Sequence, residues 1–176
     1  MIRKNLHFVM MITAIAICNI ASAQLYIDNA QFFIQSGATV TVQGNVTSNA
    51  DIQGTGKLQL KGSSIQTVSM AGKKIPNLEI DNVNNATLST SAEVTGDLLF
   101  TNGNILLGAN NLSLGSAATV TTPTAAKHVV TDGTGKLRKA ALTTAFTFPV
   151  GNSATSYNPV AITNAGTADT IAVRCL

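Results

Sequence analysis

Short runs in which apolar and polar residues alternate recur along the chain. Five are prominent, at residues 40–44, 58–62, 78–82, 98–102 and 112–116. A period of two is the pattern of a β-strand with one buried face. Nearly all of these runs end in Gly or Asn, which tolerate the backbone angles of tight turns. No helical pattern of useful length follows Gln24, so we predict an all-β protein.

The spacing of the runs predicts a β-solenoid. Their starts lie 18, 20, 20 and 14 residues apart, and weaker strands at 86–89 and 92–95 fall between them. A repeat near 20 residues suggests a parallel β-helix-like coil in which each turn stacks on the one before. Pairs such as Leu58 and Leu60 would then point into a shared core, as would Leu78/Ile80 and Leu112/Leu114. The irregular spacing leaves a β-sandwich as the alternative, while propeller blades would be about twice as long.

The repeat pattern fades after Val120. Residues 121–126 are typical of a loop, and Pro149 and Pro159 favour edge strands or strand starts. We therefore assign 24–124 to the solenoid and 125–176 to a C-terminal cap or an incomplete second β-module. The sequence ends within a strand-like run at 170–176, so we expect it to be part of a larger protein.

The first 23 residues have the layout of a secretory signal peptide. Arg3 and Lys4 precede an apolar stretch over 8–20 that is too short to span a membrane, and Ala21-Ser22-Ala23 forms a small-residue cleavage site. We expect the protein to be exported to the cell surface or medium, or to the periplasm if a C-terminal sorting region is missing. No membrane span is expected after cleavage.

Charge and cysteine content exclude several classes. Without Arg3 and Lys4 the chain has nine basic and eight acidic side chains, which is no basic footprint for nucleic acid. The single remaining cysteine, Cys175, cannot form an intramolecular disulfide. Stability must then come from packing and hydrogen bonds.

The pentapeptide GTGKL occurs at 54–58 and 133–137. A phosphate-binding loop needs G-x-x-x-x-G-K-[ST], but Leu58 and Leu137 stand at the hydroxyl position. We interpret both copies as solvent-exposed turns that precede a strand. We expect their glycines to have positive φ angles, and Lys57 and Lys136 to be free in water.

The sequence indicates no catalytic, cofactor-binding or metal site. His128 is the only histidine after the leader, and we expect it to be a packed or surface residue. The carboxylates are scattered, and we expect them to be solvated turn residues: Asp28, Asp51, Glu79, Asp81, Glu93, Asp97, Asp132 and Asp169. The calcium-binding repeat G-G-x-G-x-D is absent, so we expect Asn and Asp to bond their own turns.

Five stretches resemble large surface proteins of Bacteroidota-type bacteria, many of which are type IX secretion substrates. They are GKLQLKGSSIQTV (56–68), NLEIDN (77–82), VTGDLLFTNGNI (94–105), HVVTDGTGKL (128–137) and FTFPVGN with YNPVAI (146–162). The resemblance implies stacked β-helix-like coils followed by a β-module, with no catalytic residues to transfer. Such proteins usually end in a sorting domain, and we expect none within these residues.

These observations predict a secreted, non-enzymatic structural or adhesin-like surface protein. Surface glycans or other cell-surface proteins are the expected partners. One alternative is a polysaccharide-active β-helix enzyme, in which Asp81 or Asp97 would meet Lys57 or Lys61 on an exposed strand face. A second is a carbohydrate-binding module, which would need coplanar exposed aromatics among Phe32, Phe33 and Phe100.

Overall fold

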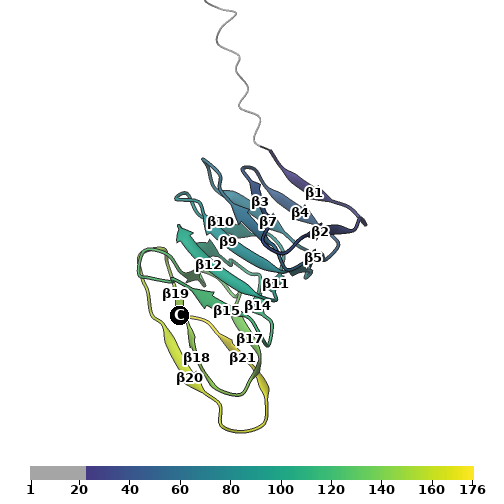
Figure 1. Ribbon diagram of the computed structural model, residues 1–176. Coiled ribbons are helices and arrows are strands. Elements are labelled where there is room, and N and C mark those ends of the chain that lie inside the picture. The colour runs from purple at the N-terminus through teal and green to yellow at the C-terminus, as the bar shows by residue number, and fades with distance from the viewer. Residues whose placement is uncertain (1–22) are drawn as a thin grey trace, which may run out of the picture.

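The protein is a β-solenoid. The computed structural model describes residues 23–176, and every regular element in that range is a β-strand. The chain winds through about six stacked turns, and each turn contributes strands to three sheets (Figure 1). Apart from Ala23, the predicted signal peptide lies outside the described residues. The predicted solenoid is confirmed, and the alternative β-sandwich is not the fold.

Three sheets form the stack, and only sheet A runs along its whole length. Sheet A contains β1 (Leu25–Ile27), β4 (Val46–Ser48), β7 (Gln66–Ser69), β10 (Ala86–Leu88), β13 (Ile105–Leu106), β16 (Val129–Val130) and β19 (Val150–Gly151). Sheet B contains β8 (Lys74–Ile75), β11 (Ala92–Val94), β14 (Leu112–Leu114), β17 (Leu137–Leu142) and β21 (Asp169–Val173). Sheet C contains β3 (Thr39–Val42), β6 (Lys57–Leu60), β9 (Asn77–Asp81), β12 (Asp97–Asn102) and β15 (Thr119–Thr121). Two smaller pairs are β2 (Phe32–Ile34) with β5 (Ile52–Gly54), and β18 (Ala145–Phe148) with β20 (Val160–Thr163).

The register of sheet C matches the predicted repeat. Val40 pairs with Leu58, Leu58 with Leu78, and Leu78 with Leu98, all in parallel. The next residue in this column is Val120 of β15, which pairs with Leu98. The run at 112–116 instead supplies β14 of sheet B, which explains why it broke the spacing near 20.

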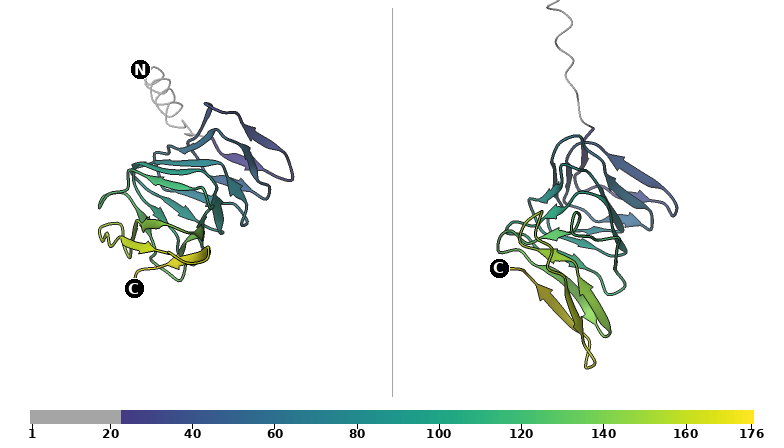
Figure 2. Two further views of the ribbon diagram at one scale, coloured as in Figure 1. Left: turned by 60° about the horizontal axis from the view of Figure 1, so that its bottom comes forward. Right: turned by 90° about the vertical axis from the view of Figure 1, so that its left-hand side faces the viewer.

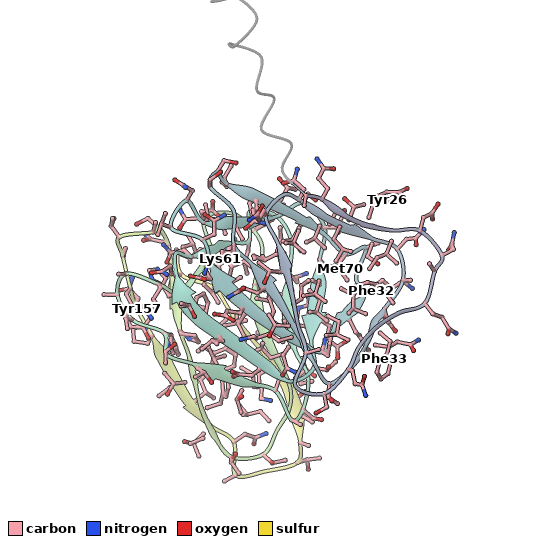
Figure 3. All side chains as sticks on the ribbon, turned by 45° about the horizontal axis from the view of Figure 1, so that its top comes forward. Tyr26, Phe32, Phe33, Lys61, Met70 and Tyr157 are labelled. Carbon is pink, nitrogen blue, oxygen red and sulfur yellow. The ribbon has the colours of Figure 1, made fainter. Side chains whose placement is uncertain are left out.

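The inward side chains form one continuous apolar core. Leu58, Leu78 and Leu98 are fully buried, and the alternate positions Leu60, Ile80 and Phe100 stack beside them. Burying one such side chain contributes roughly 1.5–3 kcal/mol relative to leaving it exposed. Successive coils are therefore held together mainly by the packing of equivalent apolar residues in columns. Outward aromatics are found at the first coil, where Tyr26 and Phe33 project from the surface (Figure 3).

The two GTGKL copies turn corners and lead into strands, but their predicted geometry is wrong in part. Among their four glycines only Gly54 has a positive φ, of 96°. Gly56 and Gly135 are buried. A Cβ atom at Gly56 would overlap Ile34 and Gln35, and one at Gly135 would overlap Asn110. Close approach of adjacent coils, more than backbone conformation, requires glycine at both sites.

The stacking changes near the C-terminus. Parallel pairing continues past residue 124 through β16, β17 and β19. β18 does not join sheet C, because it pairs antiparallel with β20. β21 pairs antiparallel with β17. Phe148 is fully buried and meets Phe146 edge-on at 4.9 Å between ring centroids. This antiparallel segment lies at the end of the stack farthest from residue 23 (Figure 2).

Candidate functional site: polar ladders on the outward face of sheet C

Asparagine side chains at the corners join one coil to the next. The Oδ1 atom of Asn45 accepts from the Thr67 backbone N–H at 2.8 Å, and that of Asn85 accepts from the Asn104 N–H at 2.8 Å. Asn111 does the same for the Lys136 N–H at 3.1 Å. These residues were expected to bond their own turns, which does occur at Asn82. The longer-range bonds arise because corners of successive coils lie directly above one another.

An ion pair crosses the outward face of sheet C between β6 and β9. Lys57 Nζ lies 2.5 Å from Glu79 Oε2, and Thr101 Oγ1 donates to Glu79 Oε1 at 2.7 Å. The Glu79 side chain is only 6% exposed, whereas that of Lys57 is 34% exposed. Oε2 has no polar partner besides Lys57 in the part of the chain that the structure describes. The negative charge of Glu79 is therefore compensated by one cation, Lys57.

A second cluster lies beside the first, toward the end of the same strands. Lys61 Nζ lies 2.8 Å from Asp81 Oδ2, and Asn102 Nδ2 donates to Asp81 Oδ1 at 2.7 Å. Gln59 also reaches Asp81, at 3.4 Å, and its own Oε1 accepts from Thr41 at 2.8 Å. A hydrogen-bonded chain thus runs from β3 through β6 and β9 to β12.

These two clusters hold the carboxylates of Glu79 and Asp81 in their charged form. Burial acts to raise the pKa of Glu79, but the contacts of its carboxylate with Lys57 and Thr101 outweigh burial and hold that pKa below its usual value. The hydrogen bond from Lys61 comes first among the causes that lower the pKa of Asp81, followed by that from Asn102. Reciprocally, Asp81 raises the pKa of Lys61.

Asp97 opens β12 at the edge of these clusters. Its Oδ1 accepts from Thr119 Oγ1 at 2.8 Å and from Thr121 Oγ1 at 2.7 Å. Asp97 also lines a shallow hollow of about 380 Å³ that includes Lys57 and Asn77. The alternative enzyme would need an acid–lysine contact at Asp81 or Asp97. The structure pairs Asp81 with Lys61, while Asp97 accepts hydrogen bonds from threonines.

Two sequence-based expectations are wrong here. Glu79, Asp81 and Asp97 lie on strands and are not solvated turn residues. Lys57 is paired and not free in water. The available signal was the repeat itself, because a step of 20 to 22 residues links Lys61 to Asp81 and Lys57 to Glu79.

His128 and Cys175 lie away from sheet C. The His128 side chain is fully buried, its Nε2 lies 3.1 Å from the Ser153 carbonyl oxygen, and its ring centroid lies 5.1 Å from that of Tyr157. If Nε2 donates to that carbonyl, Nδ1 is left as a buried acceptor without a partner within residues 23–176. Cys175 is a half-buried free thiol. His128 is thus packed, one of the two positions expected for it.

Across residues 23–176, no three His, Cys, Asp or Glu side chains gather closely enough to hold a metal ion. The same range contains no helix with the length and hydropathy of a membrane span. Comparisons with protein-family models, curated proteins and solved structures find no match to this chain.

Proposed function

We propose that this chain is an exported, non-enzymatic structural or adhesin-like protein of a cell surface, similar to the surface proteins of Bacteroidota-type bacteria. One observation carries the proposal. Four charged side chains on the outward face of sheet C form two ion pairs between successive coils, Lys57 with Glu79 and Lys61 with Asp81. These groups hold the stack together, which is what an extended scaffold requires.

The protonation behaviour of the carboxylates supports a structural role. A general acid or base works best with a pKa near the operating pH. Glu79 and Asp81 instead have lowered pKa values and lysine partners, so both stay ionised at neutral pH. Adhesion would use the polar outward surface, with surface glycans or other cell-surface proteins as partners.

The proposal is tested by export and adhesion together. The full chain is expressed with its leader in a Gram-negative host, and the mass of the product is measured after cell fractionation. We expect a product that starts at Gln24 and lies outside the cytoplasm. A matched variant in which Arg3 and Lys4 are both replaced by glutamate should be processed poorly, because the leader loses its positive region.

Beads coated with the purified product should then adhere to cells or to glycan-coated surfaces more strongly than beads coated with an unrelated protein of similar charge. An unprocessed cytoplasmic product, or no adhesion to any cell or glycan tested, would contradict the proposal.

A polysaccharide-active enzyme is the second candidate, favoured by the buried Glu79 beside Lys57. It predicts turnover of an acidic or neutral glycan by the wild-type protein. Glu79→Gln should abolish that turnover while Asp169→Asn, an exposed position on β21, should leave it unchanged. A glycan panel that yields no products would dismiss this candidate.

A further inference from the structure

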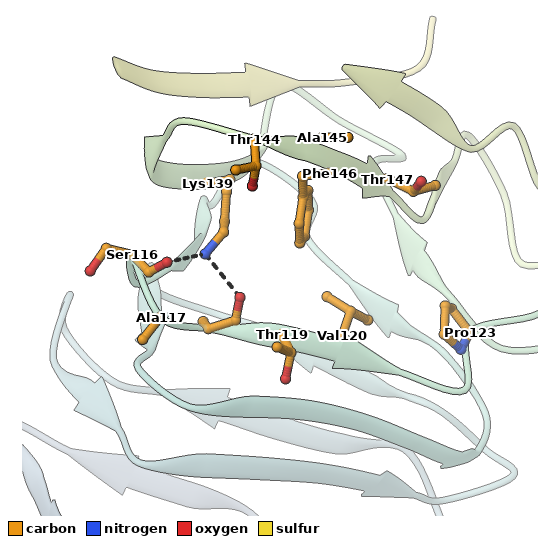
Figure 4. A pocket seen from close by; sticks show the side chains of 11 residues that line it. Ser116, Ala117, Thr119, Val120, Pro123, Lys139, Thr144, Ala145, Phe146 and Thr147 are labelled. Carbon is orange, nitrogen blue, oxygen red and sulfur yellow. Dashed lines mark hydrogen bonds between the residues drawn. The ribbon is translucent and has the colours of Figure 1, made fainter. Parts of the chain in front are cut away.

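A groove separates β15 from β18 at the C-terminal end of sheet C. β18 follows the course of a sixth strand but pairs with β20 instead of β15. The space that remains has a volume of about 460 Å³ (Figure 4). Val120, Pro123 and Phe146 line it with apolar surface, and Thr144 and Thr147 stand on its rim.

The groove contains a buried ammonium group. Lys139 pairs with Leu114 in the register of sheet B, and Leu114 belongs to the same column as Val94 and Ile75, so the lysine occupies a core position. Lys139 is 6% exposed. Its Nζ donates to the carbonyl oxygens of Gly115 at 2.6 Å, Ser116 at 2.8 Å and Ala118 at 2.9 Å.

The charge of Lys139 has no counter-ion within the described residues. Both ion pairs found in residues 23–176 lie on the outward face of sheet C, at Lys57 and Lys61. Three carbonyl dipoles satisfy the hydrogen-bonding capacity of the ammonium, but they supply no net negative charge. Buried charges are ordinarily paired, so an anion bound in the groove would compensate the charge of Lys139. Burial also lowers the pKa of Lys139.

We propose that this groove binds a sugar that carries a carboxylate, an inference that rests on the proposed extracellular role. The carboxylate would take the place of the Ser116 carbonyl as the third acceptor of Lys139. That exchange is feasible because Ser116 and Ala117 form an exposed turn. The Phe146 ring, whose centroid lies 5.5 Å from Lys139 Nζ, would stack on the apolar face of the sugar.

The rim supplies donors and acceptors for sugar hydroxyls. Thr144 and Thr147 are exposed, and neither hydroxyl is engaged in a hydrogen bond within residues 23–176. An apolar wall with a few convergent polar groups is the usual make-up of a small-molecule site. The charge, the aromatic ring and the free hydroxyls together favour an acidic sugar over a simple carboxylic acid.

The test compares two ligands that differ only at C6. Methyl β-glucuronide carries a carboxylate where methyl β-glucoside carries a hydroxymethyl group. Each is titrated into the leader-processed protein and followed by amide resonances in NMR. We expect the glucuronide to shift resonances of residues 116–120 and 144–147, and to bind at least about tenfold more tightly than the glucoside, which corresponds to about 1.4 kcal/mol.

Three variants test whether the glucuronide binds at Lys139 and Phe146. Lys139→Met keeps an unbranched chain in the core and should weaken glucuronide binding at least about tenfold. The matched control Lys136→Met removes the same charge from an exposed position just before β17 and should leave binding unchanged. Should Lys139→Met fail to fold, Phe146→Leu preserves the ammonium and should still weaken binding of the glucuronide.

Equal affinity for both sugars, resonance shifts confined to β6, β9 and β12, or no shift at the highest soluble concentration would overturn the inference. The same experiments distinguish failure of this inference from failure of the proposed function. Adhesion without glucuronide binding would leave the scaffold role intact, whereas glucuronide binding by a protein that is not exported would retain the site and reject that role.

Discussion

At the scale of single residues, Lys57 and Lys136 show how the same local sequence acquires different surroundings. Each follows Gly-Thr-Gly, yet Lys57 pairs with the buried Glu79 while Lys136 is exposed. The sequence alone predicted that both would be free in water. The difference arises because the coil that follows places a carboxylate beside Lys57.

Replacing Lys57 by alanine should therefore destabilise the protein. The change leaves Glu79 Oε2 buried without its only polar partner, which costs about 1–3 kcal/mol in the free energy of unfolding. Lys136→Ala should change that free energy by less than about 0.5 kcal/mol. Urea denaturation of both variants measures the difference, and equal small effects would show that the ion pair contributes nothing.

The pH dependence of stability should report Glu79. Its pKa in the folded protein is below the ordinary value of 4.5, so its contribution is complete above pH 4.5 and declines as the pH falls through the folded value. Glu79→Gln should be less stable than wild type at pH 7. The gap should narrow at low pH, because the wild-type carboxylate becomes protonated. Thermal melts from pH 7 down to pH 3 measure it, and a gap that does not depend on pH would contradict the assignment.

At the scale of the elements, the alternating runs predicted strands because a strand with one buried face must alternate. Sheet C was predictable in register, since Val40, Leu58, Leu78 and Leu98 repeat at nearly constant spacing. The departure of β18 from sheet C was not predictable, because Phe146 and Phe148 alternate as a stacked strand would. Local sequence does not determine whether β18 pairs with β20 or with β15.

The candidate site was predictable only in outline. A lysine–carboxylate contact at Asp81 was considered only as a requirement of the alternative enzyme, and the role of Glu79 required the exact register between β6 and β9. Lys139 was missed because a charged residue at a core position contradicts the alternating pattern. Its acceptors are backbone carbonyls, which have no signature in the sequence.

Corner glycines should prove sensitive to any side chain. Gly56→Ala places a Cβ against Ile34 and Gln35 and should destabilise the protein by about 1–3 kcal/mol, as overpacking does. Gly166→Ala is the matched control, because its φ is ordinary and its nearest neighbour would lie 3.5 Å away. That variant should be neutral or slightly stabilising, through reduced entropy of the unfolded chain. Similar losses at both glycines would count against close approach as the cause.

At the scale of the whole molecule, stability should vary along the stack. Each coil contacts mainly its neighbours, so a central coil has two partners and a terminal coil has one. We expect amide hydrogen exchange to be slowest in β9 and β12. It should be fastest in β1, β2, β20 and β21, where side chains are more exposed. Uniform protection along the chain would indicate that all the coils open as one unit.

The stacking of coils also sets how the molecule would respond to tension. The strands lie across the stack and hydrogen bonds run between successive coils, so a pull along the stack loads those bonds one coil after another. The coils would then unfold one at a time from one end of the stack. Each unfolded coil of some 20 residues would add about 70 Å of extended chain. A solenoid built this way would absorb a sudden load by lengthening and would keep its remaining coils folded.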